Sequence, residues 1–386
     1  MLIAALSLSG WPASAYRDLD FFQFRAGARA LLEGASPYDA SWWQAFHDRE
    51  GSQVLAILRR YSEATWTTPY PLWTFIVLLP FGAPPLAVSA AAWLVVQVGA
   101  VGAGVAALIA RLRPLRDERT LVLVFALALT FQPAWYLVAS GNLTGLTFAA
   151  LAFAVAAALT RDERAGFALA LTIIKPQSFV IFALALLGGL APQVRRAVLR
   201  NALVVVAILG FIALALEPTW PIEWARNAAV LQSSNGSNAT GWTLGRLFGG
   251  PFVGVASIAA VMFTFALWWA VRRPAYDYVL AGSIPVSVFI APHGWTHEHL
   301  YLLVSALILI ARRAEIPGQP RMLWTVAILF VFSVLPWALY SPTNETASAL
   351  VPLAVLTLVM LMETLEVRAV KRELRTWEAQ PAGASA

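Results

Sequence analysis

A series of apolar runs, each near the length that crosses a bilayer, constrains this chain most. A spanning helix needs about 20 apolar residues, whereas about 10 to 14 indicate an interfacial or re-entrant segment. The runs lie at residues 86–110, 120–138, 143–160, 197–216, 251–271, 276–291, 299–311, 321–340 and 348–365. Only 12% of the 386 residues are charged, about half the share in a soluble domain. We therefore predict an all-α polytopic membrane protein that forms one domain over residues 1–386.

Two further segments decide the predicted topology. The run at 71–82 is too short to span comfortably, and the run at 165–190 is broken by Lys175 and Pro176, because proline removes a backbone donor and clashes with the preceding turn. If the first is a juxtamembrane helix and the second is two short helices, the basic clusters all fall on one side. That side is predicted to be cytoplasmic. The clusters are Arg111/Arg113/Arg116/Arg119, Arg161/Arg164, Arg195/Arg196/Arg200, Arg272/Arg273, Arg312/Arg313 and Arg368/Lys371/Arg372/Arg375.

This arrangement predicts about twelve transmembrane helices, with both termini in the cytoplasm. The first apolar run, residues 1–13, is short and lacks a basic n-region, so it is not a signal peptide. Either the first helix is short or further residues precede it. The outer face then carries the loop 14–85, the tip at Lys175, the loop 217–250 and the segment 291–299, so an active site is expected to face outward.

The composition excludes several classes of protein. Cysteine is absent, which excludes disulfides, thiolate catalysis and cysteine metal sites. Lys175 and Lys371 are the only lysines among 27 basic residues, and this arginine bias is typical of a GC-rich bacterial gene. The net charge of +6 is distributed as membrane topology requires, so no nucleic-acid partner is expected. We predict a location in a bacterial cytoplasmic membrane, with membrane lipids as partners.

The stretch at residues 18–39, DLDFFQFRAGARALLEGASPYD, predicts an amphipathic helix just after the first apolar run. Asp20 and Gln23 have the spacing of a capping box, and Gly34 supplies a C-terminal stop. The helix is expected over residues 21–33, lying on the membrane surface rather than crossing it. Its predicted apolar face consists of Phe21, Phe24, Ala28, Leu31 and Leu32.

Asp20 and Asp18 are the candidate catalytic residues. For Asp20 alone, capping the helix is a sufficient explanation. Asp18 has no such local role. Two carboxylates on the predicted outer face, together with a lysine and a histidine cluster, indicate more than capping.

Lys175 is the one lysine within the apolar runs. A lysine at the centre of a membrane helix costs about 2.5 to 3.5 kcal/mol on insertion scales and usually faces a cavity and a partner. The alternative is a side chain that reaches back to the interface. The helix break and the neighbouring Gln177 favour a polar cavity.

The segment APHGWTHEH, residues 291–299, holds three of the four histidines. His293 and His297 are four residues apart and would share a helical face in a zinc site. Pro292 and Gly294 argue against that helix, and imidazoles can equally bind a phosphate or a sugar hydroxyl. We therefore predict no metal cofactor as the favoured case, with a divalent ion as the alternative.

Two other outer segments contain candidate sugar ligands. Asn142 lies in SGNLTG, and Trp242 and Arg246 lie in TGWTLGRL. They are suited to hydrogen bonding and stacking with a sugar, and equally to packing of loops.

Taken in their order along the chain, these segments resemble the GT-C glycosyltransferases. They are most similar to the bacterial polyprenol-phosphate-mannose-dependent α-mannosyltransferases. The resemblance implies a catalytic aspartate just before the first juxtamembrane helix, where DFFQF places Asp20 and leaves Asp18 as the near alternative. It implies a second juxtamembrane helix at Tyr70–Leu72 and a lysine-proline break at Lys175. The outer motif of the family is matched by Ala291–Trp295, although Ala291 and Gly294 stand where serines are common.

The predicted function is transfer of a hexose, mannose by the resemblance, from a polyprenyl phosphate to a hydroxyl of a glycolipid or glycan. Asp20, with Asp18 as alternative, would be the general base of an inverting transfer. The residues expected to bind substrate are Lys175, His293, His297, Arg246, Tyr70, Asn142, Gln177, Trp242 and Trp295. The rivals are a transporter or lipid-linked-sugar flippase, for which broken helices at a midplane site are expected, and a catalytically inactive scaffold.

Overall fold

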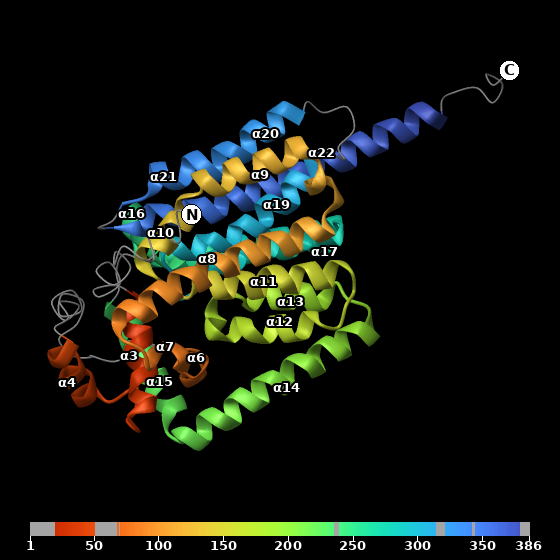
Figure 1. Cartoon of the computed structure of the whole chain (residues 1–386). Helices are drawn as coiled ribbons and strands as arrows, with labels where there is room; N and C mark the ends of the chain where they lie inside the picture. The colour runs from red at the N-terminus through yellow and green to blue at the C-terminus, as the bar shows by residue number, and fades with distance from the viewer. Residues whose placement is uncertain are drawn as a thin grey trace.

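The computed structural model describes residues 20–50, 68, 70–234, 239–313, 321–341 and 344–378. Within these ranges the chain is helical and has no β-strand (Figure 1). The first half contains α3 (Asp20–Leu32), α4 (Ala40–Glu50), α6 (Leu72–Val77), α7 (Leu79–Gly82), α8 (Leu86–Arg111), η1 (Arg113–Arg116), α9 (Glu118–Thr130), α10 (Gln132–Ser140), α11 (Thr144–Leu159), α12 (Ala165–Leu171), η2 (Thr172–Ile174), η3 (Pro176–Ser178) and α13 (Val180–Gly188). The second half contains α14 (Pro192–Leu216), α15 (Trp220–Ser234), η4 (Gly241–Thr243), α16 (Leu244–Phe248), α17 (Pro251–Arg272), α18 (Tyr276–Ile290), η5 (Thr296–Tyr301), α19 (Leu302–Arg313), α20 (Arg321–Leu329), the π-helical η6 (Phe330–Val334), α21 (Leu335–Leu339), η7 (Glu345–Ala349) and α22 (Leu350–Glu378).

Each of the nine predicted apolar runs is helical in the structure. Five helices, however, are long and apolar enough to cross a membrane in the part of the chain described, or six if the bent pair α9 and α10 is one span. The two helices of that pair meet at 49°. The prediction of twelve spans is not confirmed. The apolar helices indicate a membrane-embedded protein.

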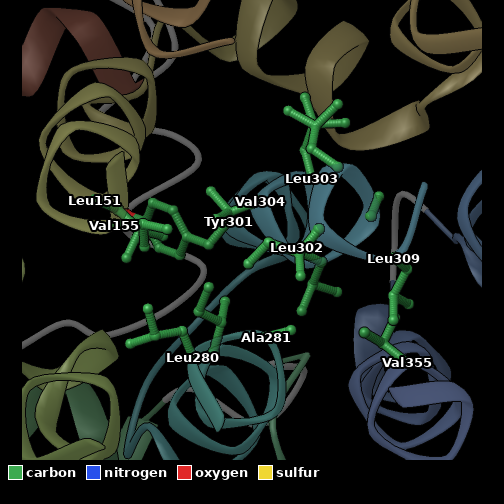
Figure 2. Packing of buried hydrophobic residues seen from close by; sticks show 14 of the residues in the cluster. Leu151, Val155, Leu280, Ala281, Tyr301, Leu302, Leu303, Val304, Leu309 and Val355 are labelled. Carbon is green, nitrogen blue, oxygen red and sulfur yellow. The ribbon is translucent and has the colours of Figure 1, made fainter. Parts of the chain in front are cut away.

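The helices that cross the middle of the molecule are largely buried. All but two residues of α19 are buried, and so are most residues of α18 and α11. Figure 2 shows this core, where Tyr301 lies beside Leu151 and Val155 of α11, and Leu309 approaches Val355 of α22. A helix that is apolar all round must be covered by neighbours or by lipid. Here protein covers them.

The outer helices expose their apolar side chains instead. Phe211 of α14 is 74% exposed and Phe263 of α17 is 68% exposed. Such broad apolar surface on long helices is expected where lipid chains replace water as solvent.

The N-terminal helix α3 ends as predicted, with Gly34 in the left-handed conformation. Its position differs from the prediction, because α3 is buried on most of its circumference against α6 and α7. The close approach requires Gly27, since a Cβ atom there would lie 2.3 Å from the Phe75 ring. Leu32, expected on the apolar face, is 48% exposed. The helix is therefore part of the protein core, and most of its apolar face packs on protein.

The arginine-bearing turns meet at one end of the helices. Arg312, at the end of α19, binds Asp277 at 2.5 Å and Glu366 at 3.2 Å. Arg200 of α14 lies 3.4 Å from Glu163 in the turn after α11. The turn that holds Glu163 follows the C-terminal end of α11. The helix begins at Thr144, and its 16 residues, each rising about 1.5 Å, place that start about 24 Å from the turn. This arrangement agrees with the prediction that the basic clusters of the turns lie on one side. In Figure 1, α8 and α14 both run from that end of the molecule to the other.

Candidate active site

A continuous chain of hydrogen bonds joins four segments at the end opposite the arginines. Asn142 donates from Nδ2 to Asp20 Oδ2 at 2.6 Å, and its Oδ1 accepts from Lys175 Nζ at 2.8 Å. Lys175 Nζ also donates to Glu298 Oε1 at 2.8 Å. Asp20 at the start of α3 is thereby linked to the break between α12 and α13 and to η5.

The turn between α10 and α11 positions Asn142. Gly141 ends α10 with φ 65°, a conformation that glycine adopts without strain. Its carbonyl accepts the Trp93 indole N–H at 2.7 Å. Asn142 Oδ1 then accepts from the Thr144 backbone N–H at 3.1 Å and from its hydroxyl at 2.7 Å. Because three donors point at Oδ1, the amide is oriented with its NH₂ group toward Asp20.

The helix break positions Lys175. Pro176 prevents α12 from continuing, and Lys175 has the irregular dihedrals φ −132° and ψ 68°. The side chain is 1% exposed, so it does not reach back to an interface, and that alternative is wrong. Its three N–H donors bind Asn142, Thr144 Oγ1 at 3.2 Å and Glu298. The ammonium is thus fully hydrogen bonded and its charge is balanced by Glu298.

Of the two acidic residues in the chain of bonds, Asp20 is the less enclosed. Glu298 is 2% exposed and held by Lys175, whereas Asp20 is partly exposed. Burial among apolar groups raises the pKa of Asp20 above the ordinary aspartate value, while Asn142 and Lys175 act in the opposite direction. A raised pKa brings the carboxylate closer to the value that suits a general base at neutral pH.

Tyr70 lies at the same site, where Asp20 and Glu298 act electrostatically on its hydroxyl. Its ring meets Phe24 of α3 edge-on at 4.9 Å, and its carbonyl accepts the Tyr38 hydroxyl at 2.8 Å. Tyr70 therefore ties the segment before α6 to the start of α3.

The histidine segment closes one side of the cluster. Trp295 donates its indole N–H to His293 Nε2 at 3.0 Å, so the neutral His293 ring carries its proton on Nδ1. Burial and the Lys175 charge lower the pKa of His293 to about 4 and lower that of His297 well below its ordinary value. Both rings are neutral near pH 7 and act as hydrogen-bonding groups, not as cations. His293 precedes η5, so the two histidines do not share a face of one helix.

Within the described ranges, the remaining residues predicted to bind substrate take no part in the chain of hydrogen bonds given above. Trp242 is 41% exposed and donates to the Ile290 carbonyl at 2.9 Å. Gln177 is half-buried in η3, next to the break. Asp18 and the side chain of Arg246 lie outside the described residues.

The sequence interpretation missed the role of Glu298. A lone buried ammonium signals a carboxylate partner, but Glu298 lies 123 positions after Lys175 and no local pattern links the two. Thr144, which supports both Asn142 and Lys175, was also missed. No three His, Cys, Asp or Glu side chains that could hold a metal ion converge among the residues that the structure describes.

The fold and this buried polar cluster together define a membrane-embedded helical protein with a candidate catalytic carboxylate. The family model of glycosyltransferase family 87 matches residues 66–292, more than half of the chain. The chain belongs to glycosyltransferase family 87, which indicates glycosyltransferase activity. The matched range includes Asn142 and Lys175, while Asp20 and Glu298 lie outside it. Comparisons with curated proteins and with solved structures find no significant match.

Proposed function

We propose that this glycosyltransferase moves a hexose, in the first instance mannose, from a polyprenyl-phosphate donor to a hydroxyl of a glycolipid or glycan acceptor. The observation that carries the proposal is the Asp20 carboxylate at the start of α3, held by Asn142 at 2.6 Å. A carboxylate that is fixed in position, and whose pKa is raised by burial, is suited to accept a proton from an incoming hydroxyl.

In the proposed reaction the acceptor oxygen attacks the anomeric carbon while Asp20 takes its proton. The bond between that carbon and the phosphate oxygen breaks, and its electron pair leaves on the phosphate. Attack opposite the leaving group inverts the anomeric centre. Asp18 keeps its place as the alternative base until the two are tested separately.

The leaving phosphate needs fixed donors or cations in a water-poor site. Because all three Lys175 donors are occupied, we assign Lys175 a positioning role: it orients Asn142 and acts on the phosphate through its charge alone. The buried Nδ1 of His293 has no partner among the described residues and carries a proton in the neutral ring. It is the proposed donor to the phosphate, with Arg246 as a further candidate.

A lipid-linked donor fits the apolar character of the chain. The described ranges are helical and offer no strand-helix unit of the kind that binds a nucleotide. The exposed apolar surfaces of α14 and α17 suit a lipid tail. We further propose that shorter helices such as α11 and α18 complete a topology of about twelve crossings, with the cluster on the outer face of a bacterial cytoplasmic membrane. The family match favours this function over a transporter.

The donor class can be tested in membrane vesicles. Vesicles containing the protein are given radiolabelled polyprenyl-phosphate mannose or radiolabelled GDP-mannose, with membranes lacking the protein as control. Protein-dependent label in lipid or glycan products from the first donor alone supports the proposal. Transfer from the nucleotide donor in washed vesicles free of polyprenyl phosphate would overturn it.

A further inference from the structure

Beside the candidate base, five side chains from three parts of the chain form a second polar and aromatic cluster. His297 in η5 packs against the Tyr136 ring of α10 at 5.6 Å, and Tyr136 lies 5.4 Å from Tyr340. Glu345 Oε2 accepts from the Thr296 backbone N–H at 2.5 Å and from its hydroxyl at 2.6 Å. The Tyr136 hydroxyl lies within electrostatic reach of Glu345. The cluster is thus built and held without His297 taking part in its hydrogen bonds.

The burial of His297 in this cluster is not explained by any hydrogen bond among the described residues. Its side chain is 2% exposed, and neither ring nitrogen has a hydrogen-bond partner among the described residues. Leaving a buried polar group unsatisfied costs roughly 1 to 3 kcal/mol, and an apolar ring of the same size would avoid that cost. A buried imidazole with two unused nitrogens beside two half-buried tyrosines indicates that a ligand supplies the missing partners.

We propose that His297, Tyr136, Tyr340 and Glu345 form a subsite for a neutral sugar ring. Tyrosine faces offer an apolar surface to the C–H side of a pyranose, and a few fixed polar groups orient its hydroxyls. A hydroxyl can donate to one imidazole nitrogen and accept from the other. An anion is disfavoured there, because the cluster contains the Glu345 carboxylate and lies within electrostatic reach of Asp20.

The position of the cluster fits the proposed transfer, on which this inference rests. Asp20 acts electrostatically on both Tyr136 and Glu345, so a ring bound there lies close to the base. The same chemistry suits the donor sugar or the acceptor sugar, and kinetics separates them.

Two variants test the subsite, with a control on the same helix. H297F keeps a ring against Tyr136 and removes both nitrogens, and Y340A removes a half-buried face at the end of α21. W135F changes a neighbouring aromatic residue of α10 that is 51% exposed and donates to the Leu129 carbonyl. Binding of methyl α-mannoside and methyl α-glucoside to the purified full chain in detergent is followed by saturation-transfer NMR, with inorganic phosphate as a competing anion.

We expect the wild type and W135F to bind a methyl pyranoside equally, H297F and Y340A to bind it roughly tenfold more weakly, and phosphate not to compete. H297F should unfold at an unchanged or higher temperature, which a purely structural histidine would not show together with lost binding. No pyranoside signal in the wild type, equal binding in both variants, or displacement by phosphate would each overturn the subsite.

Transfer assays then assign the ring, since Y340A should raise KM for either the lipid-linked donor or the acceptor. An unchanged KM for both substrates would also overturn the subsite. D20N should lose transfer and still bind the pyranoside, so failure of the proposed chemistry and failure of the subsite are distinguishable.

Discussion

Replacing Asn142 by Asp tests the contact that holds the candidate base. The exchange preserves the shape of the side chain and replaces the NH₂ group, which donates to Asp20 at 2.6 Å, by an oxygen. Lys175 would keep its bond to the other oxygen of residue 142. The variant is therefore expected to fold, with two carboxylates facing each other.

The size of the effect follows from the distance. Two unit charges 2.6 Å apart repel by about 6 kcal/mol at an effective dielectric constant of about 20, equivalent to roughly four to five pKa units. The nearby Lys175 charge offsets part of this repulsion. Near pH 7 the pair should still share one proton, as adjacent carboxylates do, so Asp20 would no longer accept a proton freely.

The assay is the pH dependence of transfer from radiolabelled polyprenyl-phosphate mannose in vesicles. Activity requires the unprotonated base, so it falls as the pH drops through the pKa. In N142D that fall should lie about one pH unit or more above the wild-type position, and the rate near pH 7 should drop at least about tenfold. N142A, which removes the donor without adding charge, should show a smaller shift. A wild-type rate and pH profile in N142D would refute the assigned contact.

Three further predictions address the ion pair, the helix packing and the base. K175M leaves Glu298 buried and unpaired, so the unfolding free energy should fall by about 3 to 5 kcal/mol. In thermal unfolding in detergent, the double variant K175M/E298Q should recover part of this loss, and losses that simply add would contradict the pairing. G27A places a Cβ 2.3 Å from Phe75 and should destabilise by about 1 to 3 kcal/mol, whereas G99A, with no atom within 4 Å, should not; equal melting temperatures would contradict the packing of α3 on α6. Burial raises the pKa of Asp20, so on acidification wild-type transfer should already be lost above about pH 3.9, the ordinary pKa of an aspartate. Full activity down to that ordinary value would argue against Asp20 as the base.

The sequence located the helices well, because apolar runs mark buried and lipid-facing helices alike. The count of membrane spans could not be read in the same way. α19 has 12 residues and α11 has 16, each covered by protein, and hydropathy does not separate such core helices from helices that contact lipid. The same ambiguity explains α3, whose apolar face was assigned to the membrane and instead packs on α6 and α7.

The sequence predicted several of the residues that form the site, but not which of these residues contact one another. A lone lysine at a proline break and an asparagine after a glycine both indicated polar roles, and the structure brings Lys175 and Asn142 to Asp20. Which acid balances Lys175 depends on contacts across 123 residues, which no local pattern encodes. The neutrality of His293 and His297 likewise follows from burial and from the Lys175 charge, which only the folded chain reveals.

The central claim is that the Asp20 carboxylate removes the acceptor proton. Its most direct test is the single-turnover rate of sugar transfer from radiolabelled polyprenyl-phosphate mannose in D20N, compared with D18N and with D39N, an exposed acid of the same segment. We predict a loss of about 10² to 10⁴ in D20N, with near wild-type rates in D18N and D39N. Undiminished transfer by a correctly folded D20N protein would contradict the account.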